Sequence, residues 1–179
     1  MEFKETELCG LYVIKPDVFE DHRGFFVESY SQLKFKNAGI ETVFVQDNHS
    51  RSVESGVLRG LHFQKPPYAQ SKLLRVIRGA VYDVVVDLRK GSPTFGQWRG
   101  FELTEKNFLM LYVPKGFAHG FCTLQPGTEV QYKVDAFYTP ESESGVIWND
   151  PYLNINWPVK EPILSKKDAL LPVFDPEAY

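Results

Sequence analysis

The chain has 179 residues, of which 43% are hydrophobic and 15% aromatic, and its formal net charge at pH 7 is −3. This profile predicts one globular domain over residues 1–179, and its charge argues against a nucleic-acid-binding protein that relies on a global positive field. No apolar run approaches the roughly 18 residues that a membrane helix needs. Cys9 and Cys122 lie far apart and no signal peptide precedes them, so we expect free thiols in a reducing cytoplasm.

Short runs rich in Val, Ile, Phe and Tyr recur along the chain, separated by Gly, Pro, Asp and Asn. This spacing predicts an all-β sandwich or barrel. One short helix is expected from Ser31, an N-cap candidate, to Gly39, and a second from Ser165, with Asp168 at capping-box spacing. Irregular coil is expected after Pro140. The predicted strands lie near residues 11–15, 24–30, 42–48, 57–64, 72–78, 80–88, 96–104, 108–113, 119–124 and 128–138.

Alternation along two of these strands bears on where polar groups point. In 128–138, Tyr132 shares a face with valines while charged residues and a glutamine share the other, so the Tyr132 face is predicted to point inward. In 80–88, Asp83 and Asp87 alternate with apolar residues on one face, and the pattern leaves open which face is inward.

The run 57–64 places His62 on the same face as Gly60 and Gln64, with Arg59 on the opposite face. If Arg59 and His62 are to meet one ligand, the strand must be irregular at Gly60. A glycine inside a strand often marks a β-bulge, so we expect one there.

Two histidines lie in otherwise apolar, strand-like runs. His119 completes a Pro-x-Gly-x-x-His pattern from Pro114, which resembles the second signature of the cupin barrels. His62 lies where a metal-binding cupin carries His-x-His, but here Gln64 takes the place of the companion ligand. Metal ligation is therefore disfavoured. A core histidine bonded to backbone and a general base both stay open for His62.

Other candidates have an ordinary explanation beside the functional one. Tyr132 is a core aromatic or a proton donor, and Lys72 is a strand-end lysine that reaches solvent or a cation that binds an oxyanion. By local pattern alone Asp168 is a capping residue, Arg23 a turn residue and Glu28 an exposed strand residue.

Taken in order, the motifs resemble the dTDP-4-dehydrorhamnose 3,5-epimerases, a family of non-metal cupins, over nearly the whole chain. The one visible departure is Ser71, where a small residue, often glycine, is expected. The matching segments are Asp-His-Arg-Gly-Phe-Phe at 21–26, Val-Gln-Asp-Asn at 45–48, Leu-Arg-Gly-Leu-His-Phe-Gln at 58–64, Ser-Lys-Leu-Leu-Arg-Val at 71–76, Pro-Lys-Gly-Phe-Ala-His-Gly-Phe at 114–121, Tyr-Lys at 132–133, Trp-Asn-Asp-Pro at 148–151 and Ser-Lys-Lys-Asp at 165–168.

The resemblance implies a cupin-type jelly roll and a role for each matching residue. His62 would be the base and Asp168 its carboxylate partner, Tyr132 the acid, and Lys72 the group facing the ketone oxygen. No metal and no other cofactor is implied. The residues implied to hold the dTDP-sugar are Arg23, Glu28, Gln46, Asp47, Asn48, Arg59, His119, Tyr138, Glu143 and Lys167, with the arginines on the diphosphate.

The implied reaction converts dTDP-4-dehydro-6-deoxy-D-glucose to dTDP-4-dehydro-L-rhamnose, in dTDP-rhamnose biosynthesis. The resemblance also favours a cytoplasmic homodimer in which Arg23 and Glu28 reach the partner's barrel. Three rivals stay open: a 3- or 5-epimerase of another nucleotide 4-ketosugar, a metal-dependent cupin enzyme, and a non-catalytic sugar-binding cupin.

Overall fold

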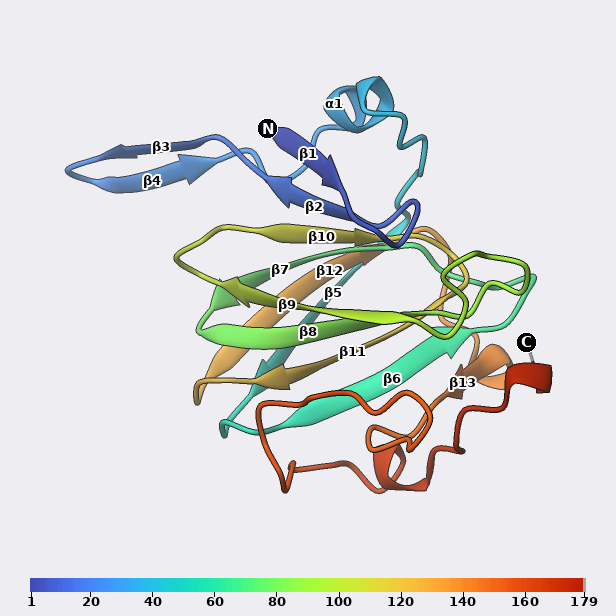
Figure 1. Cartoon of the computed structure of the whole chain (residues 1–179). Coiled ribbons are helices and arrows are strands. Elements are labelled where there is room, and N and C mark those ends of the chain that lie inside the picture. The colour runs from blue at the N-terminus through green and yellow to red at the C-terminus, as the bar shows by residue number, and fades with distance from the viewer. Residues whose placement is uncertain (179) are drawn as a thin grey trace.

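Two antiparallel sheets face each other in the computed structural model, which describes residues 1–178 (Figure 1). The first sheet has the order β1 (Glu2–Glu5), β2 (Tyr12–Lys15), β10 (Met110–Val113), β7 (Lys72–Arg78), β12 (Thr128–Val134) and β5 (Gln46–Ser52). The second has the order β13 (Glu143–Gly145), β6 (Leu58–Gln64), β11 (Phe117–Thr123), β8 (Ala80–Asp87) and β9 (Trp98–Thr104). The predicted all-β, cupin-type fold is confirmed.

The main core lies between the two sheets. Alternate residues of each strand point into this space, such as Leu74 and Val76 from β7 and Val81 and Val85 from β8. Asp83 and Asp87 share the inner face of β8 with these valines, and both are fully buried. The carboxylate-bearing face of this strand is therefore the inward one.

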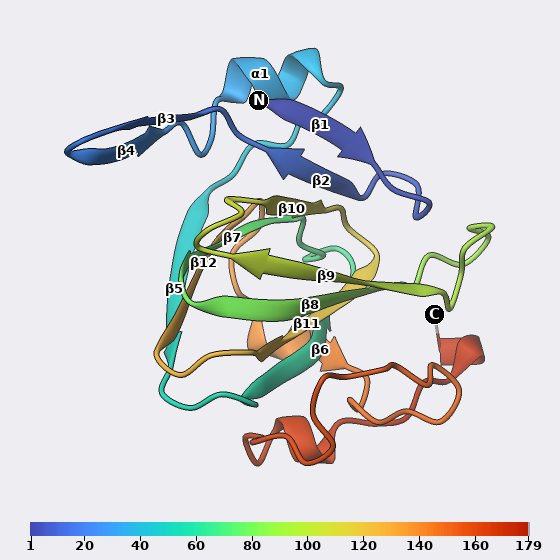
Figure 2. The ribbon, with the colours of Figure 1, turned by 60° about the vertical axis from the view of Figure 1, so that its left-hand side comes forward.

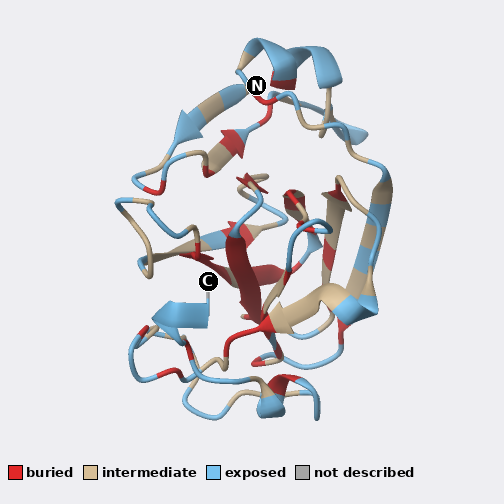
Figure 3. Ribbon diagram, turned by 90° about the vertical axis from the view of Figure 1, so that its right-hand side faces the viewer, coloured by how far each residue is buried: buried red, intermediate tan, exposed pale blue. Residues whose placement is uncertain are grey.

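The outer face of the five-stranded sheet is covered by the C-terminal part of the chain. Val84 and Val86 of β8 pack there against a cluster that includes Leu153 and Phe174. In Figures 1 and 2 this segment runs beneath β6 and β11, and Figure 3 shows buried residues concentrated in the strands it covers. β8 is consequently buried on both faces. For this reason the alternation of residues along it did not show which face points into the main core.

The N-terminal part adds a hairpin and the one α-helix of the described residues. Strands β3 (Val18–Asp21) and β4 (Gly24–Val27) pair only with each other and project from the body in both Figure 1 and Figure 2. Helix α1 (Gln32–Asn37) begins as predicted, because the Ser31 side chain accepts a hydrogen bond from the Lys34 N–H. Gly39, with φ of +83°, follows its end.

Several predicted boundaries need correction. The strand expected at 42–48 is β5, which begins only at Gln46, and the strand at 128–138 ends at Val134. The segment 24–30 is only β4, and its partner β3 was not predicted, nor were the short edge strands β1 and β13. The helix expected from Ser165 is a 3₁₀ turn, η2 (Asp168–Leu170). Two further 3₁₀ turns, η1 (Pro140–Ser142) and η3 (Pro176–Ala178), complete the description.

None of the helices in the described part of the chain has the length and hydropathy of a membrane-spanning segment.

The irregularity expected at Gly60 is present in the pairing of β6 with β11. His119 lies opposite His62, and Phe121 lies opposite Arg59, so β6 advances three residues while β11 advances two. The extra residue in β6 turns Arg59 onto the face that His62 occupies. Gly60 has φ of +123°, and a Cβ there would lie 2.6 Å from the Gly120 Cα.

We expect Gly60→Ala to lower the free energy of unfolding by at least about 3 kcal/mol. The positive φ alone costs roughly 1–2 kcal/mol, and a backbone contact that cannot relax is added to it. Urea unfolding measures the change. Gly39→Ala is the control, because its φ is also positive but its Cβ would meet nothing within 4 Å. Equal losses in the two variants would contradict the close approach of β6 to β11.

Candidate active site

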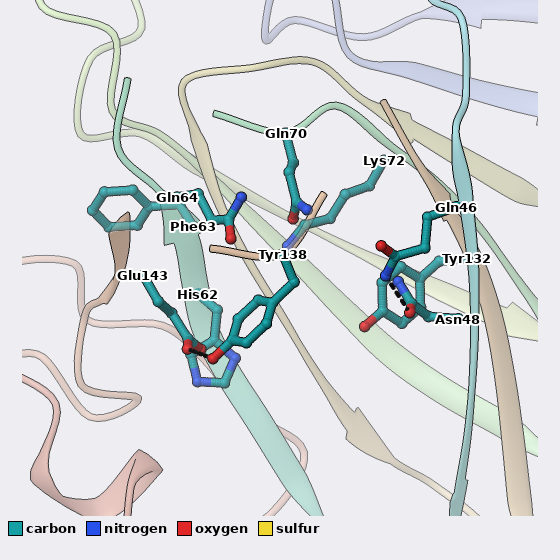
Figure 4. A pocket seen from close by; sticks show the side chains of 10 residues that line it. All are labelled: Gln46, Asn48, His62, Phe63, Gln64, Gln70, Lys72, Tyr132, Tyr138 and Glu143. Carbon is teal, nitrogen blue, oxygen red and sulfur yellow. Dashed lines mark hydrogen bonds between the residues drawn. The ribbon is translucent and has the colours of Figure 1, made fainter. Parts of the chain in front are cut away.

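Two neighbouring cavities lie between the sheets, and His62, Lys72 and Tyr132 line both of them. The first, of about 160 Å³, is shown in Figure 4. Its other lining residues are Gln46, Asn48, Phe63, Gln64, Gln70, Tyr138 and Glu143. The second, of about 290 Å³, is lined in addition by Ser50, Arg59, His119, Phe121, Ser165, Lys167 and Asp168.

His62 extends from β6 into the cavities and meets a carboxylate from the C-terminal segment. Its Nε2 lies 2.7 Å from the Asp168 Oδ1. The carboxylate oxygen does not lie in line with the ring N–H, so the contact is a close approach of the two groups rather than an aligned hydrogen bond. The predicted proximity of the two side chains is confirmed, while their roles stay predictions.

Asp168 uses its two oxygens for two purposes. Oδ1 faces His62 and accepts the Gly60 N–H at 3.3 Å, while Oδ2 accepts the Ser165 hydroxyl at 2.6 Å. The local capping contact and the long-range contact therefore coexist. Burial alone would raise the pKa of Asp168, but its contacts with His62 and Ser165 outweigh burial and lower it, so the carboxyl is ionised at neutral pH.

Tyr132 faces the cavities from the opposite sheet. It lies on β12 opposite Asn48 of β5, on the inner face predicted for it. In Figure 4, His62 and Glu143 lie on one side of the cavity, and Gln46, Asn48 and Tyr132 lie on the other. Burial raises the pKa of the Tyr132 hydroxyl, which keeps the proton on the oxygen at neutral pH.

Strand β5 contributes alternate residues to the site. Gln46 and Asn48 point inward and are joined by a 2.8 Å hydrogen bond from Gln46 Nε2 to Asn48 Oδ1. Asp47 points outward, where its carboxylate accepts a 2.8 Å hydrogen bond from Lys133. Asp47 therefore lines neither cavity of its own chain, because the alternation of the strand turns it to the other face, and its expected contact with the ligand stays a prediction.

Lys72 brings a positive charge into the cavities. It begins β7, on the inner face shared with Leu74, and burial lowers the pKa of its ammonium from 10.5 to about 8. Asp83 and Glu143 are the anions that oppose this shift. Lys72 thus remains largely protonated near neutral pH, in a place where water shields its charge poorly.

A second histidine and carboxylate lie beside Lys72. His119 Nε2 lies 2.9 Å from Asp83 Oδ2, and Asp83 is fully buried. Burial raises the pKa of Asp83, and His119 and Lys72 act against that rise. His119 lines the second cavity together with Arg59, which the bulge at Gly60 has turned inward.

Glu143 of β13 gathers two further predicted residues. Its Oε2 accepts hydrogen bonds from the Tyr138 hydroxyl and the Lys167 ammonium. Burial would raise the pKa of Glu143, but these two contacts lower it. Tyr138 lines the first cavity and Lys167 the second, so Glu143 connects the two.

Arg23 and Glu28 do not reach the cavities of their own chain. Arg23 lies on the projecting hairpin, where its NH2 group is 2.6 Å from Asp21 Oδ2. Glu28 is 2.9 Å from the Lys34 ammonium. Neither residue contributes to the site that this chain builds alone.

Other lining residues were not predicted. Ser50 and Gln70 lie outside the matching motifs, and Phe121 lies in the matching segment 114–121 but was given no role. Asp83 was recognised as a carboxylate among valines without a direction, and Gln64 only as the place where a metal ligand is missing. Among the described residues, no group of at least three His, Cys, Asp or Glu side chains is arranged to hold a metal ion.

Comparison with known proteins gives one consistent family. The family profile described as dTDP-4-dehydrorhamnose 3,5-epimerase matches residues 5–175. The Shigella flexneri protein of that name is 51% identical over 169 residues, which are 94% of this chain and 93% of the relative.

Solved structures agree with the family profile. The Bacillus anthracis dTDP-4-dehydrorhamnose 3,5-epimerase, with TDP and PPi bound, is 55% identical with a TM-score of 0.95, covering 97% of this chain and 99% of that one. The dTDP-6-deoxy-D-glucose-3,5-epimerase of Legionella pneumophila, in complex with dTDP-4-keto-L-rhamnose, is 45% identical with a TM-score of 0.92, covering 96% and 92%.

Proposed function

Because the chain belongs to the dTDP-4-dehydrorhamnose 3,5-epimerase family, we propose that it epimerises dTDP-4-keto-6-deoxyglucose at C3 and C5. The product is dTDP-4-dehydro-L-rhamnose, an intermediate of dTDP-rhamnose biosynthesis. The hydrogens on C3 and C5 both lie α to the C4 carbonyl, so both epimerisations pass through an enolate.

One observation carries the proposal: a histidine and a tyrosine face the same cavities from opposite sheets. His62 comes from β6 and Tyr132 from β12, and both line the same two cavities. A sugar ring between them has a proton acceptor on one face and a proton donor on the other. Inversion at carbon requires this arrangement, because the proton leaves one face and returns to the opposite one.

The proposed cycle moves protons only. His62 takes the proton from the α-carbon on the ring nitrogen that does not face Asp168, and the electron pair of the C–H bond passes to the C4 oxygen. The Lys72 ammonium stabilises the resulting enolate oxygen, and Asp168 stabilises the imidazolium. Tyr132 then protonates the carbon from the other face as the carbonyl re-forms. Proton exchange with water returns His62 and Tyr132 to their starting states.

The remaining cavity residues suit the nucleotide diphosphate. Arg59, His119 and Lys167 supply cationic or hydrogen-bonding groups in the second cavity, which fits a diphosphate. Tyr138 and Glu143 stand at the mouth of the first cavity with Gln46 and Asn48 opposite, where they are proposed to hold the rest of the dTDP-sugar.

We propose a homodimer in which each hairpin β3–β4 completes the partner's site. Phe19, Phe25 and Phe26 on this hairpin are each at least 60% exposed, although they are large apolar side chains. A two-stranded hairpin is marginally stable by itself in water, so a partner surface would stabilise it. Arg23 lies on the same hairpin and would enter the partner's cavity beside the diphosphate.

Both cysteines of the chain are free thiols, Cys9 exposed and Cys122 buried. Unpaired thiols are usual in a reducing compartment, and we accordingly propose a cytoplasmic enzyme.

The reaction is tested by incubating the protein with dTDP-4-keto-6-deoxyglucose in deuterated water. We expect deuterium at both C3 and C5, and we expect the same result after exhaustive chelation. Incorporation at only one carbon would identify a single-carbon epimerase. Activity lost on chelation and restored by a divalent ion would identify a metal-dependent enzyme. No incorporation at all, with dTDP bound, would identify a binding protein.

His62→Asn is the variant that tests the base in this experiment. One base serves both α-carbons, so exchange at C3 and at C5 should fall together, by about 10²–10⁴-fold or more. Binding of dTDP should remain measurable by calorimetry. Exchange near the wild-type rate at either carbon would reject His62 as the shared base.

Asp168→Asn should lower turnover at least about tenfold, because the imidazolium loses its anionic partner. Ser165→Ala is the comparison variant, since it removes the hydroxyl from Asp168 Oδ2 but leaves the carboxylate facing His62. It should cost about 0.5–2 kcal/mol of stability with a much smaller change in rate. Steady-state kinetics and urea unfolding separate the two effects. A stability loss with normal turnover in Asp168→Asn would leave this residue only its capping contact.

The shared site is tested by mixing an Arg23→Ala subunit with a His62→Asn subunit. Each homodimer should be nearly inactive. A heterodimer has one intact site, made of Arg23 from one chain and His62 from the other, so an equal mixture should recover about a quarter of wild-type activity. Mass spectrometry confirms heterodimer formation. No recovery in a confirmed heterodimer would mean that each chain builds its site alone.

A further inference from the structure

Gln64 occupies the place of the missing metal ligand, and its amide is fully engaged elsewhere. The side chain is buried, with 6% exposure. Nε2 donates to the Tyr68 carbonyl at 2.7 Å and to the Phe137 carbonyl at 3.2 Å. Oε1 accepts the Thr139 N–H at 2.7 Å. Both donors and the acceptor of the amide are therefore used within the chain.

Two of these bonds flank Tyr138. The Phe137 carbonyl and the Thr139 N–H are the backbone groups on either side of that residue, and one amide binds both. The third bond reaches Tyr68, in the loop that follows β6. Gln64 thus joins the backbone on either side of Tyr138 to a second loop, by hydrogen bonds to backbone groups of both.

Besides these bonds, the Tyr138 hydroxyl donates to Glu143 and the Thr139 carbonyl accepts the Ser142 N–H at 3.0 Å, but little apolar packing holds the segment. β12 ends at Val134, and the side chains of Phe137 and Tyr138 are 68% and 53% exposed. Burial of apolar surface therefore contributes little to the position of Tyr138. The neighbouring bonds, Gln70 Nε2 to the Ala136 carbonyl and the Ser71 N–H to Asp135, hold residues that come before it.

We infer that Gln64 is a positioning residue that fixes Tyr138 at the mouth of the first cavity for binding of the nucleotide. The inference rests on the proposed function in assigning Tyr138 to the nucleotide. Gln64 points its polar atoms to backbone groups rather than to the sugar, so it acts on ligand affinity through Tyr138. The residue that would be a metal ligand in a metal-binding cupin thereby serves the binding of substrate.

The test is a double-mutant cycle on the full chain, with dTDP as the probe and its Kd measured by calorimetry. Gln64→Met keeps the unbranched shape but removes the three hydrogen bonds, and should weaken dTDP binding about tenfold. In a Tyr138→Leu background the same substitution should have almost no further effect. Turnover of saturating substrate should stay within about twofold of wild type, since no reacting atom is touched.

A control variant and a second variant of Gln64 show whether a loss of dTDP affinity is specific to the Gln64 hydrogen bonds. Gln131→Met removes an amide from the outer face of β12, where it accepts a 3.5 Å bond from Arg75, and should bind dTDP like wild type. Gln64→Glu is the second variant, to be used if Gln64→Met does not fold. It keeps an acceptor for the Thr139 N–H but has no donor for the two carbonyls, so it should also weaken dTDP binding. Wild-type affinity in a folded Gln64 variant, or losses that simply add in the double variant, would overturn the inference.

Hydrogen exchange provides a readout that needs no ligand. The Thr139 amide should exchange faster in Gln64→Met than in wild type, while amides of β12 should keep their protection. Unchanged exchange at Thr139 would overturn the inference even if the wild type bound no dTDP. Failure of wild-type dTDP binding or of deuterium incorporation would count against the proposed function instead.

Discussion

The close approach of β6 and β11 at Gly60 and Gly120 is the constraint on which the site depends. A bulge at this point turns Arg59 onto the face of His62, and the Gly60 N–H binds the carboxylate of Asp168. One backbone irregularity therefore brings an arginine and a histidine of the same strand together with an aspartate from the C-terminal part of the chain. A side chain at Gly60 would separate the strands and disturb all of these contacts at once.

The charges of the site are arranged in pairs that limit the cost of burying them. Asp168 lies against His62, Asp83 against His119, and Glu143 against Lys167. Lys72 has no bonded partner in the described residues and stands between these pairs, with burial lowering the pKa of its ammonium. A cation without a bonded partner stabilises a negative charge that develops beside it, and in the proposed reaction that charge is the enolate oxygen.

The parts of the fold that follow local rules could be predicted from the sequence, and the parts set by distant contacts could not. Ser31 caps its helix, Gly60 marks a bulge and Tyr132 points inward, each through chemistry visible within a few residues. The direction of Asp83 could not be read, because β8 is buried on both faces. The edge strand β13 reads Glu-Ser-Gly and is defined by its pairing with β6 rather than by an apolar pattern. Alternation along β5 would have turned Asp47 outward, but resemblance placed it in the site.

The position of Asp168 in the sequence also bears on the order in which parts of the site form during synthesis. The carboxylate belongs to a segment that follows every strand of both sheets and folds back over β6 (Figure 1). During synthesis the double sheet and its histidine can form before that segment has left the ribosome. His62, the proposed base, would then be in place without the Asp168 carboxylate, and the proposed pair would be complete only when the segment that carries Asp168 docks against β6.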